Sequence, residues 1–244
     1  MLIDTVTLAI VHSHMPVFQL TDQIIFPHPE LAEKNGVLAV GGDLKPQRVL
    51  EAYRLGIFPW YSENDPILWW FISPRLILFP EELRVTRRLA RYFRNSTLSF
   101  SINKAFEEVI TACAINRTLQ GEETWITSEM LTAYINLHHL NFAHSIECWE
   151  KDKLVGGLYG IALGKVFFGE SMFSSVANAS KFALIHLVDF LRKNDYQLID
   201  CQMTTAHMVS LGARELPGKA FQHLLKQHIK TTTSDGAWPH EENT

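Results

Sequence analysis

The chain has 244 residues, a formal net charge of −4 and a hydrophobic content of 47%. This composition predicts a folded protein with a sizeable core and excludes intrinsic disorder for most of the chain. No apolar run approaches the ~20 residues that span a bilayer and no signal peptide is recognisable, so we expect a cytoplasmic protein without membrane contact. The three cysteines are scattered and lack metal-ligand spacing, which excludes a disulfide framework and disfavours a metal site.

The N-terminal part of the chain predicts short strands and one helix. The first fifteen or so residues alternate weakly, as a strand or a loose arm would. Residues 35–43 predict a short apolar strand that ends in a glycine turn, and a helix follows from Pro46 until Gly56. Residues 56–71 are rich in aromatic residues and prolines and show little helical period.

From residue 76 the pattern changes to longer alternating elements. We expect a strand over 76–79, a basic helix over about 86–94 and a strand over 98–102. Asn103 is expected to open a helix that runs to about residue 114, and Thr127 to cap a second helix that extends to residue 140.

Three strands in antiparallel order follow, over residues 143–150, 154–163 and 166–171. A long helix from 178 to 193, a strand over 198–202 and a helical stretch around Phe221 come next, and residues beyond 230 are expected to be disordered. This order predicts an α+β fold and is the one used by N-acyltransferases of the acetyltransferase superfamily, an analogy that says little about the substrate.

A run of arginines lies in the expected basic helix. It consists of Arg84, Arg87, Arg88, Arg91 and Arg94, with no acidic residue between them. On a helix, Arg87, Arg91 and Arg94 share one side. The run is compatible with a solvated helix face or with a local phosphate contact, although the net charge argues against a protein that grips long nucleic acid.

Several catalytic and cofactor motifs are absent from the sequence. It contains no nucleophile elbow, no phosphate-binding loop and no dinucleotide fingerprint. The junction before the long helix, residues 173–181, has no glycine turn to hold a pyrophosphate, so coenzyme A is disfavoured and no cofactor is expected.

Polar residues instead interrupt two apolar strands. Glu170 ends one of them, and Asp200 and Gln202 lie two apart on another, where strand alternation would put both on one face. Buried polar groups are costly unless they are paired. Two readings stay open: a buried hydrogen-bond network that joins the strands, or a site that binds a cation or an amine.

Strings of residues in a fixed order resemble those of the leucyl/phenylalanyl-tRNA–protein transferases. They include Asn35-Gly-Val-Leu-Ala-Val-Gly-Gly-Asp-Leu44, Gly169-Glu-Ser-Met-Phe-Ser174 and Ile199-Asp-Cys-Gln202, with further matches at 54–60, 65–70, 124–127, 144–147, 178–181 and 207–213. The similarity covers about residues 30 to 215. After Gln202 the chain has Thr204-Thr205-Ala206, where relatives often have Asn-Asp before the histidine.

This resemblance implies a small N-terminal α+β domain over residues 1–75, packed on an acetyltransferase-like (GNAT-like) domain over 76–244. It implies transfer of Leu or Phe, and less well Met, from aminoacyl-tRNA to the α-amine of proteins that begin with Arg or Lys, which marks them for degradation. We expect the chain to act as a monomer.

The resemblance also assigns roles to particular residues. Gln202 would contact the attacking amine, Asp200 would polarise Gln202, and Glu170 would be a second anionic contact. Trp60 and Trp125 would hold the terminal adenosine, because a base gains about 1–3 kcal/mol by stacking on an aromatic ring. The arginine run would lie beneath the acceptor stem of the tRNA. The expected walls of the side-chain pocket are Leu158, Phe167, Met172, Leu187 and Ile199.

Two alternatives remain beside this reading. One is an N-acyltransferase of the same fold with another donor, such as an aminoacyl-tRNA ligase of cell-wall type. The other is a tRNA-binding module without catalysis.

Overall fold

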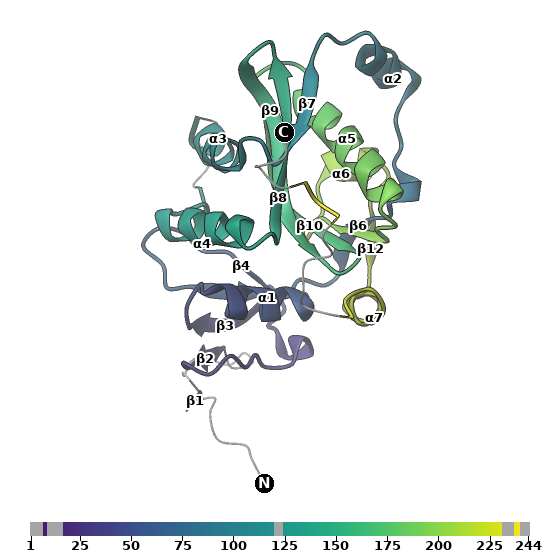
Figure 1. Ribbon diagram of the computed structural model, residues 1–244. Helices are drawn as coiled ribbons and strands as arrows, with labels where there is room; N and C mark the ends of the chain where they lie inside the picture. The colour runs from purple at the N-terminus through teal and green to yellow at the C-terminus, as the bar shows by residue number, and fades with distance from the viewer. Residues whose placement is uncertain (1–6, 9–16, 120–123, 231–236, 240–244) are drawn as a thin grey trace.

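The computed structural model describes residues 7–8, 17–119, 124–230 and 237–239. Two β-sheets organise these residues (Figure 1). The smaller sheet has the strand order β1-β2-β3-β5-β4, in which β2 and β3 are parallel and the other neighbours antiparallel. Its strands are β1 (Thr7–Leu8), β2 (Phe18–Leu20), β3 (Val37–Gly41), β4 (Phe58–Pro59) and β5 (Leu68–Trp70).

The larger sheet has the order β12-β6-β11-β10-β9-β8-β7, and only β10 and β11 pair in parallel within it. Its strands are β6 (Arg75–Leu78), β7 (Ser99–Ile102), β8 (Ala143–Glu150), β9 (Lys153–Leu163), β10 (Val166–Ser174), β11 (Leu198–Asp200) and β12 (Arg214–Leu216).

Helices cover both faces of the larger sheet (Figure 1). Helices α3 (Phe106–Leu119) and α4 (Ser128–His139) lie on one face, and α5 (Ala179–Lys193) lies on the other. Neighbouring strand residues therefore enter different clusters of buried side chains: Tyr159 and Phe168 pack with the α3–α4 side, whereas Leu158 and Phe167 pack with the α5 side.

The remaining helices are short or lie near the sheet edges. They are α1 (Pro46–Arg54), α2 (Arg87–Arg94), α6 (Ala206–Ser210) and α7 (Gly218–His228), with the 3-10 turns Pro29–Leu31 and Pro80–Glu82. Among the helices of the described residues, none combines the length and the apolar character that crossing a membrane requires.

The C-terminal helix α7 packs beside the N-terminal part of the chain (Figure 1). Gly56 has a φ of +77°, and a Cβ atom there would lie 2.7 Å from Phe221 of α7. Only glycine suits a position that needs both the left-handed backbone and such a close approach. One cluster of buried residues consequently runs from Leu38 and Trp69 of the small sheet through Phe221 to the large sheet. The division at residue 75 stays an interpretation, since the core is continuous across it.

Most of the expected elements are present, and the main differences are the following. Asn103 does not open a helix: it has a φ of 60°, its Oδ1 accepts from the Ser145 amide, and α3 begins at Phe106. Strand β11 ends at Asp200 rather than at residue 202, and β12 and α6 were not expected. Beyond residue 230 the structure describes residues 237–239, where Trp238 is buried, which differs from the expected disorder.

Candidate active site

A cavity of about 520 Å³ lies between the large sheet and α5. All five expected pocket walls line it, namely Leu158, Phe167, Met172, Leu187 and Ile199. Its polar lining includes Glu170, Gln202 and His207. A mainly apolar cavity with a few convergent polar groups is the usual form of a small-molecule site, so this cavity is the candidate active site.

A β-bulge directs Glu170 out of the regular alternation of β10. Gly169 pairs with Gly160 of β9 and Ser171 pairs with Tyr159, so Glu170 is the extra residue between two consecutive pairs. Bulges of this kind re-aim side chains and are over-represented next to active sites. The bulge explains how a glutamate can leave the pleat and lie in the cavity wall.

Two buried tyrosines bind the Glu170 carboxylate. The Tyr53 hydroxyl, from α1, donates to Oε1 at 2.8 Å, and the Tyr134 hydroxyl, from α4, donates to Oε2 at 3.0 Å. The two hydroxyl oxygens are 2.5 Å apart. Each phenol has a single proton, and in this arrangement both protons are donated to Glu170, which accepts them as a carboxylate.

The pKa of Glu170 lies in the range that suits proton transfer. Removal from water raises it to about 7, the hydrogen bonds from Tyr53 and Tyr134 partly oppose this, and the nearby Asp200 charge adds to it. Burial raises the pKa of both tyrosines well above their usual value, so they remain hydrogen-bond donors. At neutral pH both the acid and the carboxylate form of Glu170 are therefore populated.

Gln202 reaches Glu170 from the end of β11. Its Nε2 donates to Glu170 Oε1 at 3.3 Å. The prediction that Gln202 and Asp200 lie on one face of a strand is wrong, because β11 ends at Asp200 and Gln202 has a φ of 51°. Asp200 stabilises this left-handed turn through its Oδ1, which accepts from the Gln202 backbone N–H at 3.0 Å.

Asp200 is sealed away from the cavity. It is fully buried, and the Arg75 guanidinium donates to it twice, from Nε at 2.7 Å and from Nη2 at 2.6 Å. The charge of Asp200 is thus neutralised within the protein, and the described cavity lining does not include it. Its geometry suits positioning of the Gln202 backbone and not direct contact with an amine.

Arg75, Tyr53 and Tyr134 are site residues that the sequence reasoning missed. Arg75 is fully buried, and its guanidinium lies 4.9 Å from the Phe58 ring and 4.8 Å from the Phe221 ring. The sequence did contain a sign of this role, because Arg75 begins a strand that is otherwise apolar. The two tyrosines gave no comparable signal, since a tyrosine on the apolar side of a helix is ordinary core.

Trp60 and Trp125 lie outside the described lining of this cavity. Trp60 is partly exposed and packs on Trp70 with ring centroids 5.2 Å apart, and Trp125 is buried just before α4. The hydroxyl of Tyr61, next to Trp60, donates to Glu129 of α4 at 3.3 Å, which ties the two segments together. Their role with adenosine stays a prediction.

Comparison with known proteins adds the deciding observation. Residues 77–226 match the family model described as leucyl/phenylalanyl-tRNA protein transferase, and residues 42–71 match the model of its N-terminal domain. A leucyl/phenylalanyl-tRNA–protein transferase from Desulfotalea psychrophila is 53% identical over 92% of this chain and 99% of its own. Another, from Syntrophobacter fumaroxidans, is 52% identical over 93% and 97%. The chain belongs to the leucyl/phenylalanyl-tRNA–protein transferase family. It is accordingly an aminoacyltransferase.

Likeness to solved structures adds nothing to this assignment. The L-PGS structure from Bacillus licheniformis has a TM-score of 0.38 and 11% identity, over 75% of this chain and 62% of that one. A likeness at that level carries no argument about the fold. The architecture observed here is α+β. The expected acetyltransferase-like relationship is not confirmed.

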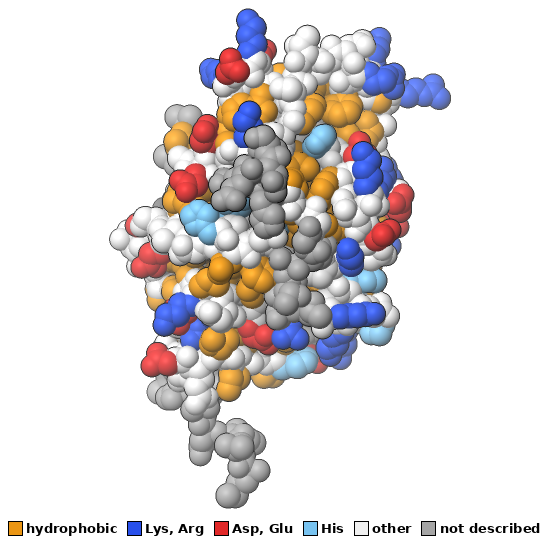
Figure 2. Space-filling model, in the orientation of Figure 1, with side chains coloured by type: hydrophobic (Ala, Val, Ile, Leu, Met, Phe, Trp, Pro, Cys, Tyr) orange, Lys and Arg blue, Asp and Glu red, His pale blue; other side chains and the backbone are white. Residues whose placement is uncertain are grey.

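The arginine run of this transferase is exposed. Arg84, Arg87, Arg88, Arg91 and Arg94 all have exposed side chains on or beside α2. Figure 2 shows Lys and Arg side chains gathered at the upper right, where Figure 1 places α2. Leu89 is the buried residue that fastens α2 to the core. The geometry fits a phosphate contact, and it equally fits a solvated face.

The segment Thr204-Thr205-Ala206 supplies the residue that caps helix α6. Thr205 Oγ1 accepts from the Met208 amide at 3.2 Å and so caps α6. Helix α6 presents His207 to the cavity, where burial lowers the pKa of the imidazole, and its Nε2 lacks a hydrogen-bond partner among the described residues. The lowered pKa favours the neutral form of the imidazole.

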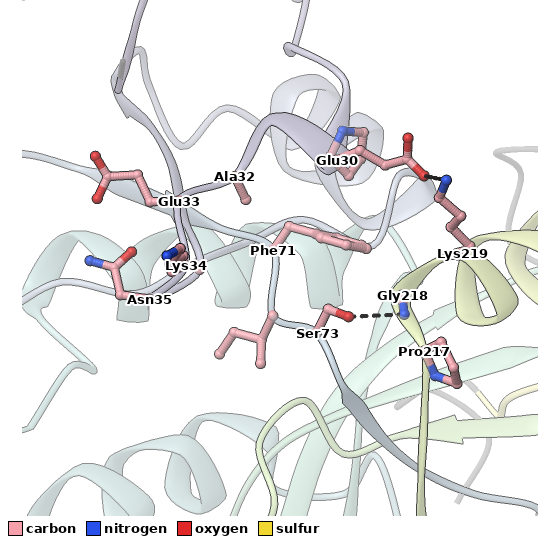
Figure 3. A pocket seen from close by; sticks show the side chains of 13 residues that line it. Glu30, Ala32, Glu33, Lys34, Asn35, Phe71, Ser73, Pro217, Gly218 and Lys219 are labelled. Atoms are coloured by element: carbon pink, nitrogen blue, oxygen red, sulfur yellow. Dashed lines mark hydrogen bonds and ion pairs between the residues drawn. The ribbon is translucent and has the colours of Figure 1, made fainter. Parts of the chain in front are cut away.

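A second cavity, of about 610 Å³, lies between the N-terminal part and α7 (Figure 3). There Lys219 pairs with Glu30 at 3.1 Å, and the Gly218 amide donates to Ser73 Oγ at 3.0 Å. These contacts hold α7 against the N-terminal part of the chain. Across the described residues no cluster of His, Cys, Asp or Glu is suited to a metal ion.

Proposed function

We propose that the aminoacyl group of the donor binds in the 520 Å³ cavity and is transferred there to the α-amine of an acceptor protein. The observation that carries the proposal is the meeting of an apolar pocket with Glu170 and Gln202 in one cavity wall. An apolar side chain such as Leu or Phe fits the pocket, and its ester would lie at the polar rim.

The reaction is aminolysis of an ester. The amine nitrogen bonds to the ester carbonyl carbon, the bond from that carbon to the ribose oxygen breaks, and a proton moves from the nitrogen to the ribose oxygen. The amine must be neutral to attack, whereas its ordinary pKa is about 7.7–8.0, so a proton acceptor assists. Because the pKa of Glu170 is about 7, it is suited to receive that proton.

Gln202 would orient the amine. Its amide nitrogen is engaged by Glu170, which leaves its side-chain oxygen to accept a hydrogen bond from the attacking nitrogen. Asp200 would act through the Gln202 backbone. Cys201 also lines the cavity, but burial raises the pKa of its thiol, so a thiolate nucleophile and a covalent intermediate are disfavoured.

The finer specificity follows from the same groups. An apolar pocket separates substrates by only about 1–3 kcal/mol per methylene, so we expect Leu and Phe as donors and Met as a weaker one. A carboxylate in the cavity wall, Glu170, suits an acceptor that begins with Arg or Lys. Such transfer would mark the acceptor for degradation that depends on its N-terminal residue.

The tRNA would approach from α2, with its terminal adenosine near Trp60 and Trp125. The partly exposed Trp60 is the better candidate for stacking on the base, since Trp125 is buried. One chain supplies every group named here, so we propose that the transferase works as a monomer.

The test uses the purified chain, tRNA charged with labelled leucine, and two peptides that differ only in an N-terminal Arg or Asp. Label is expected on the Arg peptide and not on the Asp peptide. Equal labelling of both peptides would overturn the acceptor assignment. Retention of charged tRNA without transfer would indicate a binding module, and label found only on lipid or cell-wall precursors would indicate another acyltransferase.

A further inference from the structure

Trp238, near the C-terminus, is buried among residues that are distant from it in the sequence. It is 2% exposed, and its ring stacks on His144 of β8 with centroids 4.1 Å apart and planes at 6°. Its Nε1 donates to the Tyr196 hydroxyl at 2.8 Å. A buried tryptophan whose N–H has a partner is a strong packing anchor.

The backbone beside Trp238 is also fastened to the large sheet. The Asn103 Nδ2 donates to the Pro239 carbonyl oxygen at 2.8 Å. Asn103 is itself fixed, because its Oδ1 accepts from the Ser145 amide at 3.0 Å. The indole is therefore held by a hydrogen bond of its own N–H and by a second hydrogen bond to the neighbouring backbone.

Trp238 packs directly behind two walls of the cavity. Its ring lies 5.6 Å from Phe167, which lines the cavity from β10. It lies 4.4 Å from Phe190 of α5, which follows the lining residue Leu187 by three positions and so lies one turn further along the helix. The indole thus supports both Phe167 and the helix that carries Leu187.

We propose that Trp238 is a positioning residue that sets the depth of the donor side-chain pocket and so the preference between leucine and phenylalanine. The proposal rests on the proposed function, which puts the donor side chain in this cavity. Protein interiors are packed without spare volume, so removal of the indole leaves a hollow into which Phe167 can move. A deeper pocket favours the larger donor side chain.

The test compares kcat/KM for phenylalanyl-tRNA and leucyl-tRNA in the full-length wild type and in Trp238→Ala. We expect the Phe-to-Leu ratio to rise about threefold or more, since small changes in an apolar pocket change discrimination by about tenfold. Trp238→Phe keeps an aromatic ring in place and should stay close to the wild-type ratio. If Trp238→Ala does not fold, Trp238→Leu is measured in the same way.

Two controls separate the possible causes. Trp149→Ala removes a partly buried indole whose N–H is bound by Ser101 and which lies outside the cavity lining, so it should leave the ratio unchanged. Leu187→Ala alters the lining directly and should change the ratio.

The role of Trp238 would be overturned if Trp238→Ala lowered kcat/KM equally for both donors while Leu187→Ala changed the Phe-to-Leu ratio. An unchanged ratio in Leu187→Ala would instead contradict the placement of the donor side chain.

Discussion

The pKa of Glu170 is higher than that of an ordinary surface glutamate. Two tyrosine hydroxyls and the Gln202 amide bind its oxygens, while the cavity removes it from water. The removal from water outweighs the hydrogen bonds, and the pKa rises to about 7. A carboxylate acceptor has about four lone-pair directions and the protein fills three, so one direction remains for a substrate proton.

Glu170→Gln removes the proposed proton acceptor and keeps the size of the side chain. We expect the rate of leucyl transfer to fall about 100-fold or more, in line with the usual contribution of general base catalysis. In the wild type the rate should rise with pH through about 7, as Glu170 loses its proton. The variant should lose that step and retain only the rise caused by the substrate amine.

The measurement is kcat/KM between pH 5.5 and pH 9, in the wild type, Glu170→Gln and the exposed control Glu81→Gln. The pH range follows from the amine and Glu170 pKa values. The control should match the wild type. An unchanged pH profile in Glu170→Gln would show that another group accepts the proton.

The Arg75–Asp200 pair predicts a coupled loss of stability. Removal of one partner of a buried pair leaves the other charge unpaired, so Arg75→Met should lower the free energy of unfolding by about 3–5 kcal/mol. The double variant Arg75→Met, Asp200→Leu should recover much of this loss, since no buried charge remains. Its transfer activity should stay low, because the Gln202 turn has lost its acceptor.

Urea unfolding of the two single variants and the double variant measures the coupling. Additive losses would contradict it, since independent sites add and contacting sites do not.

At the scale of elements, local signals predicted the helices and central strands well. Thr127 was expected to cap a helix, and its Oγ1 accepts from the Met130 amide at the start of α4. The strands β8 and β9 and the turn between them were also predicted correctly. These features depend on residues close in sequence, which is why periodicity and capping chemistry find them.

Elements that depend on distant partners were not predictable in the same way. Strand β12 has three residues and exists because Glu215 pairs with Leu76 of β6. The end of β11 at Asp200 depends on Arg75, and the Asn103 turn depends on Ser145 of β8. The resemblance suggested the five apolar walls, but only the fold shows that they share one cavity.

Helix α2 predicts a dependence of tRNA affinity on salt. Arg88→Glu with Arg91→Glu should raise the KM for charged tRNA and flatten its slope against salt concentration, if these exposed arginines contact phosphates. The control is Lys151→Glu with Lys153→Glu, which makes the same change of charge at the exposed turn between β8 and β9. Equal salt slopes in the two double variants would indicate that α2 is merely solvated.

At the scale of the whole molecule, the candidate site is assembled from both sheets and their helices. Tyr53 comes from α1 beside the small sheet, Tyr134 from α4, Glu170 from β10, and Gln202 from the end of β11. Phe58 of the small sheet and Phe221 of α7 enclose the arginine that holds Asp200. The N-terminal part therefore contributes side chains to the candidate site, and the continuous core keeps these groups in register.

The most direct test of the central claim is a crystal structure of the transferase with a non-hydrolysable leucyl-adenosine analogue. The account predicts the leucyl side chain against Phe167 and Leu187, with its carbonyl group beside Gln202 and Glu170. A leucyl group bound elsewhere, for example in the cavity between Ser73 and Lys219, would contradict it.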